Sequence, residues 1–238
     1  MLYYIFFIIC LFEVINAAIK SENEVINALK GYNSEVTLNF NSQININKNI
    51  TINNSIRKLS IIGSSLTSSS LYLNYPFNFN SNLEEIEIKN ININGDLYFR
   101  NNKRIVFNTV NLNGYIHSEF DEYTNEYFTI KKLAYIPAGK FVKNCISLSG
   151  NVNIDNSSFQ GSSACQDRLL HYNGFSSYTF DLKESSFNGD KKCPFLHIEY
   201  ASKANIEYTL FEKGYSSGDI DGGYIYIYIF KEYIYYIF

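Results

Sequence analysis

Two histidines occupy equivalent points in two similar segments, His171 in Leu170-His-Tyr172 and His197 in Leu196-His-Ile198. If these segments lie side by side, the two imidazoles could bind a metal ion together or change protonation near neutral pH. Two histidines alone are too few ligands for a closed zinc site, which takes four. The sequence therefore favours a stacked, outward-facing pair, and we expect neither a resident metal nor a cofactor.

Three charged residues, Asp155, Lys183 and Glu207, each directly follow a short segment in which apolar residues alternate. Their signs alternate too, so on neighbouring strands they would attract one another by about 0.2–1 kcal/mol per pair. A catalytic Asp-Lys-Glu group is one interpretation. A solvated surface row is favoured, because no two acids follow one another from segment to segment in this row.

Two cysteines also suggest chemistry, because Cys165 and Cys193 each stand six residues after a phenylalanine, Phe159 and Phe187. On neighbouring turns of one structure, their Cα atoms could fall within the about 4.4–6.8 Å that a disulfide requires. We predict a Cys165–Cys193 bridge that leaves Cys145 unpaired. A pair of reduced thiols is the alternative.

The framework that must position these residues is a repeat. An apolar-x-apolar pair is followed by four residues, a third apolar residue and, two positions later, a Gly or small residue. The copies start at positions 59, 86, 105, 128, 152, 180 and 204. Their average spacing of about 24 residues, with variable intervals, is typical of a solenoid whose loops differ in length.

Each apolar-x-apolar pair is typical of a short strand whose alternate side chains face inward. Two or three such strands per repeat predict an all-β fold, a right-handed parallel β-helix of about seven coils over residues 18–223. An antiparallel sandwich is the alternative, but the chain lacks the regular Asn-Gly spacing of hairpin turns.

The N-terminal region contains two further signals. Ser21 and Glu24 form a capping-box pattern, and Val25, Ala28 and Leu29 share one helical face, which predicts a helix over 22–30. Such a helix would cover the open end of the solenoid. Before it, residues 1–12 are an almost unbroken apolar run that is too short to span a bilayer. Ile15-Asn16-Ala17 follows with a small residue at the cleavage position, which predicts a secretory signal peptide over residues 1–17. A membrane anchor or a buried strand is the alternative.

Three Asn-x-Ser/Thr sequons, at Asn49, Asn53 and Asn156, are candidate glycosylation sites in a secreted chain. Residues 224–238 are a low-complexity run of Tyr and Ile, which we interpret as a truncated coil or a run-on product. A terminal strand and a surface contact are the alternatives.

The N-terminal part of the chain resembles the start of right-handed parallel β-helix proteins of the pectate-lyase-like superfamily. The resemblance rests on the predicted helix and the segments that follow it, Val36-Thr-Leu38, Ile50-Thr-Ile52 and Leu59-Ser-Ile61-Ile62-Gly63. Two later segments resemble repeats of secreted surface β-helix proteins: Asn156-Ser-Ser-Phe159-x-Gly161 and Glu184-Ser-Ser-Phe187-x-Gly189. The resemblance covers residues 20 to about 227 and implies the fold. It leaves function open, because the superfamily contains lyases, hydrolases and inert scaffolds.

For enzymes of this superfamily, the resemblance implies clustered Asp residues with an Arg or Lys base, or grouped Asp residues with a Gly-His-Gly. The chain contains no Gly-His-Gly and no adjacent Asp pair. The formal net charge of −3 argues against a nucleic-acid binder. We therefore expect a non-catalytic secreted or cell-surface protein that presents rows of side chains to a polysaccharide or a protein. A polysaccharide lyase or hydrolase, and a segment of a larger scaffold, are the alternatives.

Overall fold

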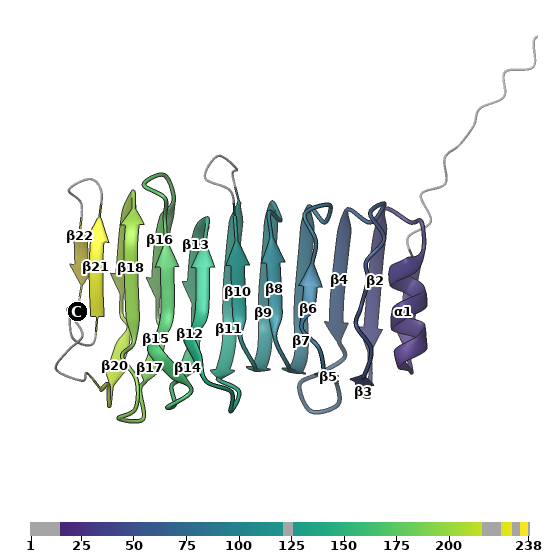
Figure 1. The fold of residues 1–238 in the computed structure, drawn as a ribbon, viewed down its shortest axis with the longest axis horizontal. Coiled ribbons are helices and arrows are strands. Elements are labelled where there is room, and N and C mark those ends of the chain that lie inside the picture. The colour runs from purple at the N-terminus through teal and green to yellow at the C-terminus, as the bar shows by residue number, and fades with distance from the viewer. Residues whose placement is uncertain (1–14, 121–125, 216–224, 230–233, 238) are drawn as a thin grey trace, which may run out of the picture.

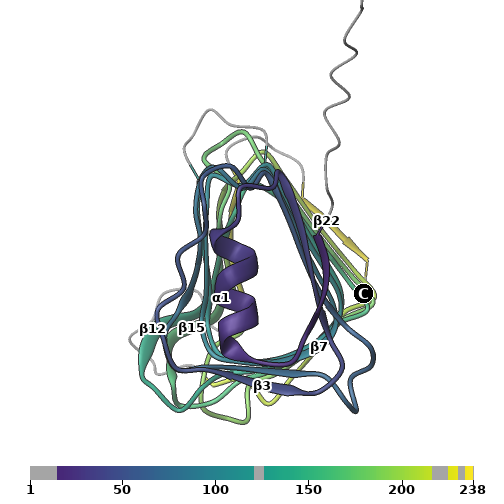
Figure 2. The same cartoon turned by 90° about the vertical axis from the view of Figure 1, so that its right-hand side faces the viewer.

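The chain winds into a parallel β-solenoid of about seven turns, as the computed structural model of residues 15–120, 126–215, 225–229 and 234–237 shows. The coils stack along one axis, with a single helix at the N-terminal end (Figure 1). Viewed along that axis, each coil outlines a rough triangle (Figure 2). This is the predicted β-solenoid architecture.

The strands form three faces, which belong to two sheets. The first face belongs to the larger sheet and contains β1 (Ile15–Ile19), β2 (Glu35–Phe40), β4 (Lys58–Gly63), the first halves of β7 (Glu85–Asn94), β9 (Arg104–Asn113) and β11 (Tyr127–Ile136), then β13 (Asn151–Asp155), β16 (Thr179–Lys183), β19 (Lys203–Glu207) and β22 (Ile234–Ile237).

The second face continues the same sheet around a bend. It contains β3 (Gln43–Ile46), β5 (Ser70–Leu73), the second halves of β7, β9 and β11, then β14 (Ser158–Gln160), β17 (Ser186–Asn188) and β20 (Leu210–Glu212). The third face is the seven-stranded sheet of β6 (Phe77–Phe79), β8 (Leu97–Arg100), β10 (Ile116–Glu119), β12 (Val142–Ser149), β15 (Cys165–Asn173), β18 (Leu196–Ala201) and β21 (Ile225–Ile229).

The inward residues of the repeat lie in one column, as the sequence predicts. The Cα partners from coil to coil on the first face are Ile86, Ile105, Phe128, Val152, Phe180 and Ala204, and all six are buried. A neighbouring column inside the second face stacks Phe159 on Phe187 and Phe187 on Phe211, with ring centroids 4.5 and 5.1 Å apart. The core is therefore a set of columns parallel to the axis.

The bend between the first and second faces uses one residue per coil in the left-handed backbone region. Its φ lies between 46° and 60° in six successive coils, at Asn90, Thr109, Lys132, Asn156, Glu184 and Tyr208. Such a conformation costs a non-glycine residue about 1–2 kcal/mol, so the paired strands on both sides must hold it. Because the bend recurs in register, the side chains that follow it also align.

Helix α1 (Glu22–Lys30) confirms the predicted cap. Its buried residues are Val25, Ala28 and Leu29, and the helix lies within the outline of the coils (Figure 2). The Ser21 hydroxyl accepts a hydrogen bond from the Glu24 amide at 3.4 Å. The Glu24 carboxylate accepts from the amide of Lys20 at 2.7 Å, one residue further back than in a standard capping box.

Both ends of the repeat contain strands, which the sequence indicated as alternatives and not as the favoured interpretation. The predicted signal peptide lies mostly outside the described residues, and β1 pairs with β2 from Ile15↔Val36 onward, so cleavage after Ala17 would remove the first three residues of that strand. In the Tyr/Ile tail, Ile225 pairs with Leu196 and Ile234 with Ala204. The tail therefore adds strands to the third and first faces instead of projecting as a single unpaired strand. Within the described residues, no helix is long and apolar enough to cross a membrane.

The predicted Cys165–Cys193 disulfide is wrong. Cys145 and Cys165 form the bridge, with Cα atoms 5.2 Å apart, and Cys193 is a buried free thiol. Leu170 and Leu196 are Cα partners, and Cys165 stands five residues before Leu170 whereas Cys193 stands three before Leu196. The two cysteines are therefore not equivalent, although each follows its phenylalanine by six residues. A bridge across 20 residues stabilises the fold by about 3 kcal/mol.

Peptide mapping of the unreduced protein tests this pairing. We expect Cys145 and Cys165 in one linked species and Cys193 as a thiol. Burial raises the pKa of the Cys193 thiol to about 11, so about one molecule in a thousand is thiolate at pH 8. Iodoacetamide should therefore modify Cys193 quickly only after denaturation in guanidinium. Recovery of a Cys165–Cys193 peptide would contradict the structure.

Close stacking at the corners gives a second prediction. A Cβ atom at Gly114 would collide with the backbone carbonyl of Gly95 in the preceding coil, whereas a Cβ at Gly139 meets nothing within 4 Å. We expect Gly114→Ala to lower the free energy of unfolding by more than about 2 kcal/mol, and Gly139→Ala to change it by less than about 0.5 kcal/mol. Chemical denaturation of both variants measures the difference, and equal effects would show that the coils do not approach closely there.

Candidate functional site

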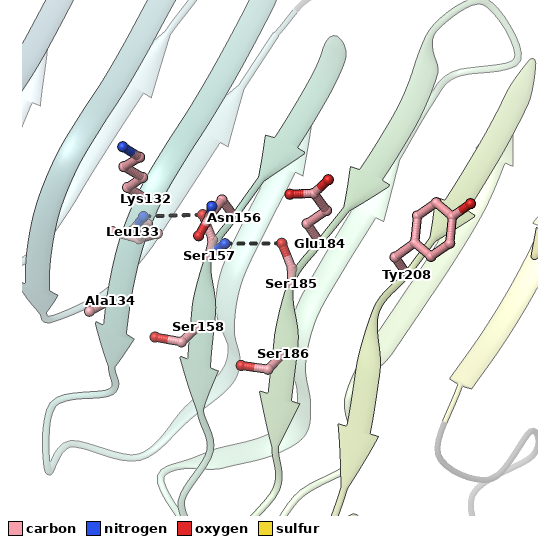
Figure 3. Close-up of a pocket in the computed structure, with 10 residues that line it drawn as sticks. All are labelled: Lys132, Leu133, Ala134, Asn156, Ser157, Ser158, Glu184, Ser185, Ser186 and Tyr208. Atoms are coloured by element: carbon pink, nitrogen blue, oxygen red, sulfur yellow. Dashed lines mark hydrogen bonds between the residues drawn. The ribbon is translucent and has the colours of Figure 1, made fainter. Parts of the chain in front are cut away.

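The outer surface of the second face contains a long polar strip. Two adjoining hollows, of about 640 and 360 Å³, share Ala134 as a lining residue and run across several coils. We call their outward-facing lining the second-face strip: Ser70, Tyr72, Asn92, Asn94, Asn111, Asn113, Lys132, Ala134, Ile136, Asn156, Ser158, Glu184, Ser186 and Tyr208. Figure 3 shows the larger hollow.

Strand register places these side chains in rows along the axis. One row of Cα partners is Ser70, Asn92, Asn111, Ala134, Ser158 and Ser186. Its members project outward because the residues on either side of each, such as Phe159 and Phe187, face the core. A side-chain substitution in one coil therefore leaves the row positions in the neighbouring coils aligned.

A hydroxyl row supports the strip from beneath. The residue after the bend is aliphatic in the earlier coils, for example Leu133, and becomes Ser157 and Ser185 in the next two. The Ser157 hydroxyl accepts from the Leu133 amide at 3.1 Å and donates to the Asp155 carbonyl at 2.9 Å. The Ser185 hydroxyl accepts from the Ser157 amide at 3.1 Å (Figure 3). These bonds satisfy buried polar groups and join successive coils.

Two asparagines of the strip, Asn92 and Asn111, are also held in place. Asn111 donates from its amide nitrogen to the side-chain oxygen of Asn92 at 2.8 Å, and Asn92 donates to the carbonyl of Ser69 at 3.2 Å. Fixed amides lose little rotamer freedom when a ligand binds. This part of the strip therefore presents preorganised amide groups.

The predicted charged row lies on the first face, beside the strip. Asp155, Lys183 and Glu207 are Cα partners in that order, and Lys183 Nζ is 3.2 Å from Glu207 Oε2. Hydrogen bonds from Asn205 and Lys183 lower the pKa of Glu207. Glu207 is consequently ionised at neutral pH and is a poor proton donor, which agrees with the favoured surface interpretation.

The two histidines also lie at equivalent positions of adjacent coils, as predicted, and their rings meet edge-on on the third face. His171 and His197 are Cα partners, and their ring centroids lie 5.1 Å apart. Burial is the main cause that lowers the pKa of each imidazole. The sequence interpretation missed Glu199, whose Oε1 is 3.0 Å from His171 Nε2. The available signal was its position two residues after His197, which places both side chains on the same side of one strand.

The three sequons lie in different environments. Asn49 and Asn156 are exposed, and Asn156 lines the second-face strip. Asn53 is half-buried: its amide nitrogen donates to the carbonyl of Lys30 at 3.1 Å, and its side-chain oxygen accepts from the Ser55 amide at 3.0 Å. A glycan at Asn53 would have to displace these contacts at the end of α1. Glycosylation at any of the three stays a prediction.

Comparisons with known proteins do not indicate a function, so the function is inferred from the geometry of the structure. No protein-family model matches the chain, and neither the curated proteins nor the solved structures include one with significant similarity to it.

Proposed function

We propose that this chain is a non-catalytic secreted or cell-surface β-helix protein of the pectate-lyase-like group, and that its second-face strip binds a neutral polysaccharide. The observation that carries this proposal is the continuity of the strip, which runs parallel to the axis across neighbouring coils. A linear polymer can contact every coil of such a surface, whereas a small ligand would use one hollow.

The dimensions support a chain-like ligand. Six strand-to-strand steps separate the coil of Tyr72 from that of Tyr208. At about 4.8 Å per step the strip is roughly 29 Å long. Each step is close to the length of one pyranose residue in an extended polysaccharide, so successive sugars would meet equivalent positions.

The side chains supply suitable contacts. Amide and hydroxyl groups donate and accept hydrogen bonds, as sugar hydroxyls require. Tyr72 and Tyr208, which are 38% and 67% exposed, offer aromatic surface near the two ends of the strip. The charged groups Lys132 and Glu184 have opposite signs. This balance favours a neutral polymer over a uronic-acid polymer.

Other features support secretion and the absence of catalysis. A disulfide such as Cys145–Cys165 persists in oxidising compartments, which agrees with the expected signal peptide. Cleavage of glycosidic bonds normally needs a protonated acid beside a carboxylate. Glu207 is ionised and paired with Lys183 instead.

Binding to a polysaccharide panel tests the proposal. The purified chain should bind neutral polymers, such as xylan, mannan or cellulose, more strongly than polygalacturonate. We expect Tyr72→Ala and Tyr208→Ala each to weaken binding about tenfold, which corresponds to about 1.4 kcal/mol. Affinity electrophoresis and pull-down with insoluble polymers provide the measurements.

Tyr127→Ala is the matched control, because Tyr127 is 51% exposed on the first face, away from the strip. This variant should bind as the unmodified chain does. The proposal fails if no neutral polymer is bound, or if Tyr127→Ala weakens binding as much as the strip variants. Release of reducing or unsaturated sugars would favour the lyase or hydrolase alternative.

A further inference from the structure

All three histidines of the chain lie in one outward column of the third face, whereas the strip residues lie on the second face. The Cα partners along this column are Tyr98, His117, Ser147, His171, His197 and Tyr226. Only at His171 and His197 do two imidazoles fall on adjacent coils. Glu199 stands two residues after His197 on β18 and therefore reaches the same side.

The three side chains converge on one point. Their ligand atoms all lie within 4.8 Å of one another. His171 Nε2 is 3.0 Å from Glu199 Oε1, and His197 Nε2 is 3.7 Å from Glu199 Oε2. In a tetrahedral zinc site with bonds of about 2.0–2.1 Å, neighbouring ligand atoms are roughly 3.4 Å apart. The two separations from Glu199 lie on either side of that value, and side-chain rotation would have to bring all three ligand atoms to it.

The surroundings favour an ion at this point. His197 Nε2 is buried and has no hydrogen-bond partner among the described residues. Tyr226 packs edge-on against the His197 ring, with centroids 4.5 Å apart, and limits its rotation. A hollow of about 330 Å³, lined by His197, Glu199, Tyr200, Tyr226 and Tyr228, opens beside the three groups. It has room for a water molecule as a fourth ligand.

We propose that His171, His197 and Glu199 form a binding site for a divalent transition-metal ion, with zinc as the best-fitting ion. Two imidazoles and one carboxylate suit zinc and its neighbours in the first transition row. Calcium and magnesium prefer oxygen ligands throughout. The ion would replace the hydrogen bond between His171 and Glu199, and it would join β15 to β18.

Two cations, Lys143 and Arg168, lie near this site and oppose a positive ion there by charge repulsion. Lys143 Nζ is 3.7 Å from Asp167 Oδ2. Arg168 donates from Nη1 to the backbone carbonyl of Asp167 at 2.8 Å. The Asp167 carboxylate offsets part of the Lys143 charge, and the three ligand atoms around one point provide for one metal ion per chain.

Calorimetric titration of the full, chelator-treated chain with zinc chloride alone tests the proposal. We expect one ion per chain, a Kd in the micromolar range or tighter, and a Tm that rises with zinc concentration. Titration with Co²⁺ should produce the visible absorption bands of a low-coordinate cobalt ion with nitrogen ligands. His171→Asn, His197→Asn and Glu199→Gln should each weaken zinc binding at least tenfold.

His117→Asn is the matched control, because His117 lies in the same column two coils from His171. This variant should retain full affinity. Circular dichroism identifies variants that fail to fold. Where a variant fails to fold, the cobalt spectrum of the unmodified chain tests the metal site instead. Absence of zinc binding by the folded chain would overturn the site. Equal loss in His117→Asn, or unchanged binding in folded Glu199→Gln, would do the same.

Discussion

In-register parallel hydrogen bonding between successive coils is the constraint on which the rest of the structure depends. Each strand pairs with its equivalents in the coils before and after, about 4.8 Å away, so a residue at a given position lies directly over its counterparts. Inward positions thereby become continuous apolar columns, such as the one from Ile86 to Ala204. Outward positions become rows. A buried polar group in one coil must find its partner in a neighbouring coil, as the hydroxyls of Ser157 and Ser185 do.

The same constraint separates the two proposed activities. On the second face, rows of Asn and Ser side chains give an extended neutral surface that is suited to a polymer. On the third face, a single register match brings His171 beside His197, and the two-residue period of β18 adds Glu199. Neither site needs a specialised loop, because the stacked strands themselves position the side chains. The sites use different faces, so loss of one leaves the other intact.

The architecture could be predicted from the sequence because both of its periods are visible there. Alternating apolar residues such as Ile86 and Ile88 indicate strands, and their return about every 24 residues indicates coils. The pairing of Cys145 with Cys165 could not be predicted, because it depends on unequal loop lengths before β15 and β18 that counting from Phe159 and Phe187 does not reveal. The second-face strip was also missed, since its hollows arise from the bend at residues such as Lys132 and Asn156. Glu199 could be predicted, because the two-residue period of a strand places it on the same side as His197.

Distances between spin labels along one outward row test the register most directly. Lys89, Asn108, Lys131, Asp155, Lys183 and Glu207 form such a row on the first face. Labels at cysteines introduced at positions 89 and 183 should be roughly 19 Å apart, and labels at 89 and 207 roughly 24 Å apart, because each coil adds about 4.8 Å. The buried thiol of Cys193 should stay unlabelled. Equal distances for the two pairs, or a second pair closer than the first, would contradict the columnar arrangement and both sites built on it.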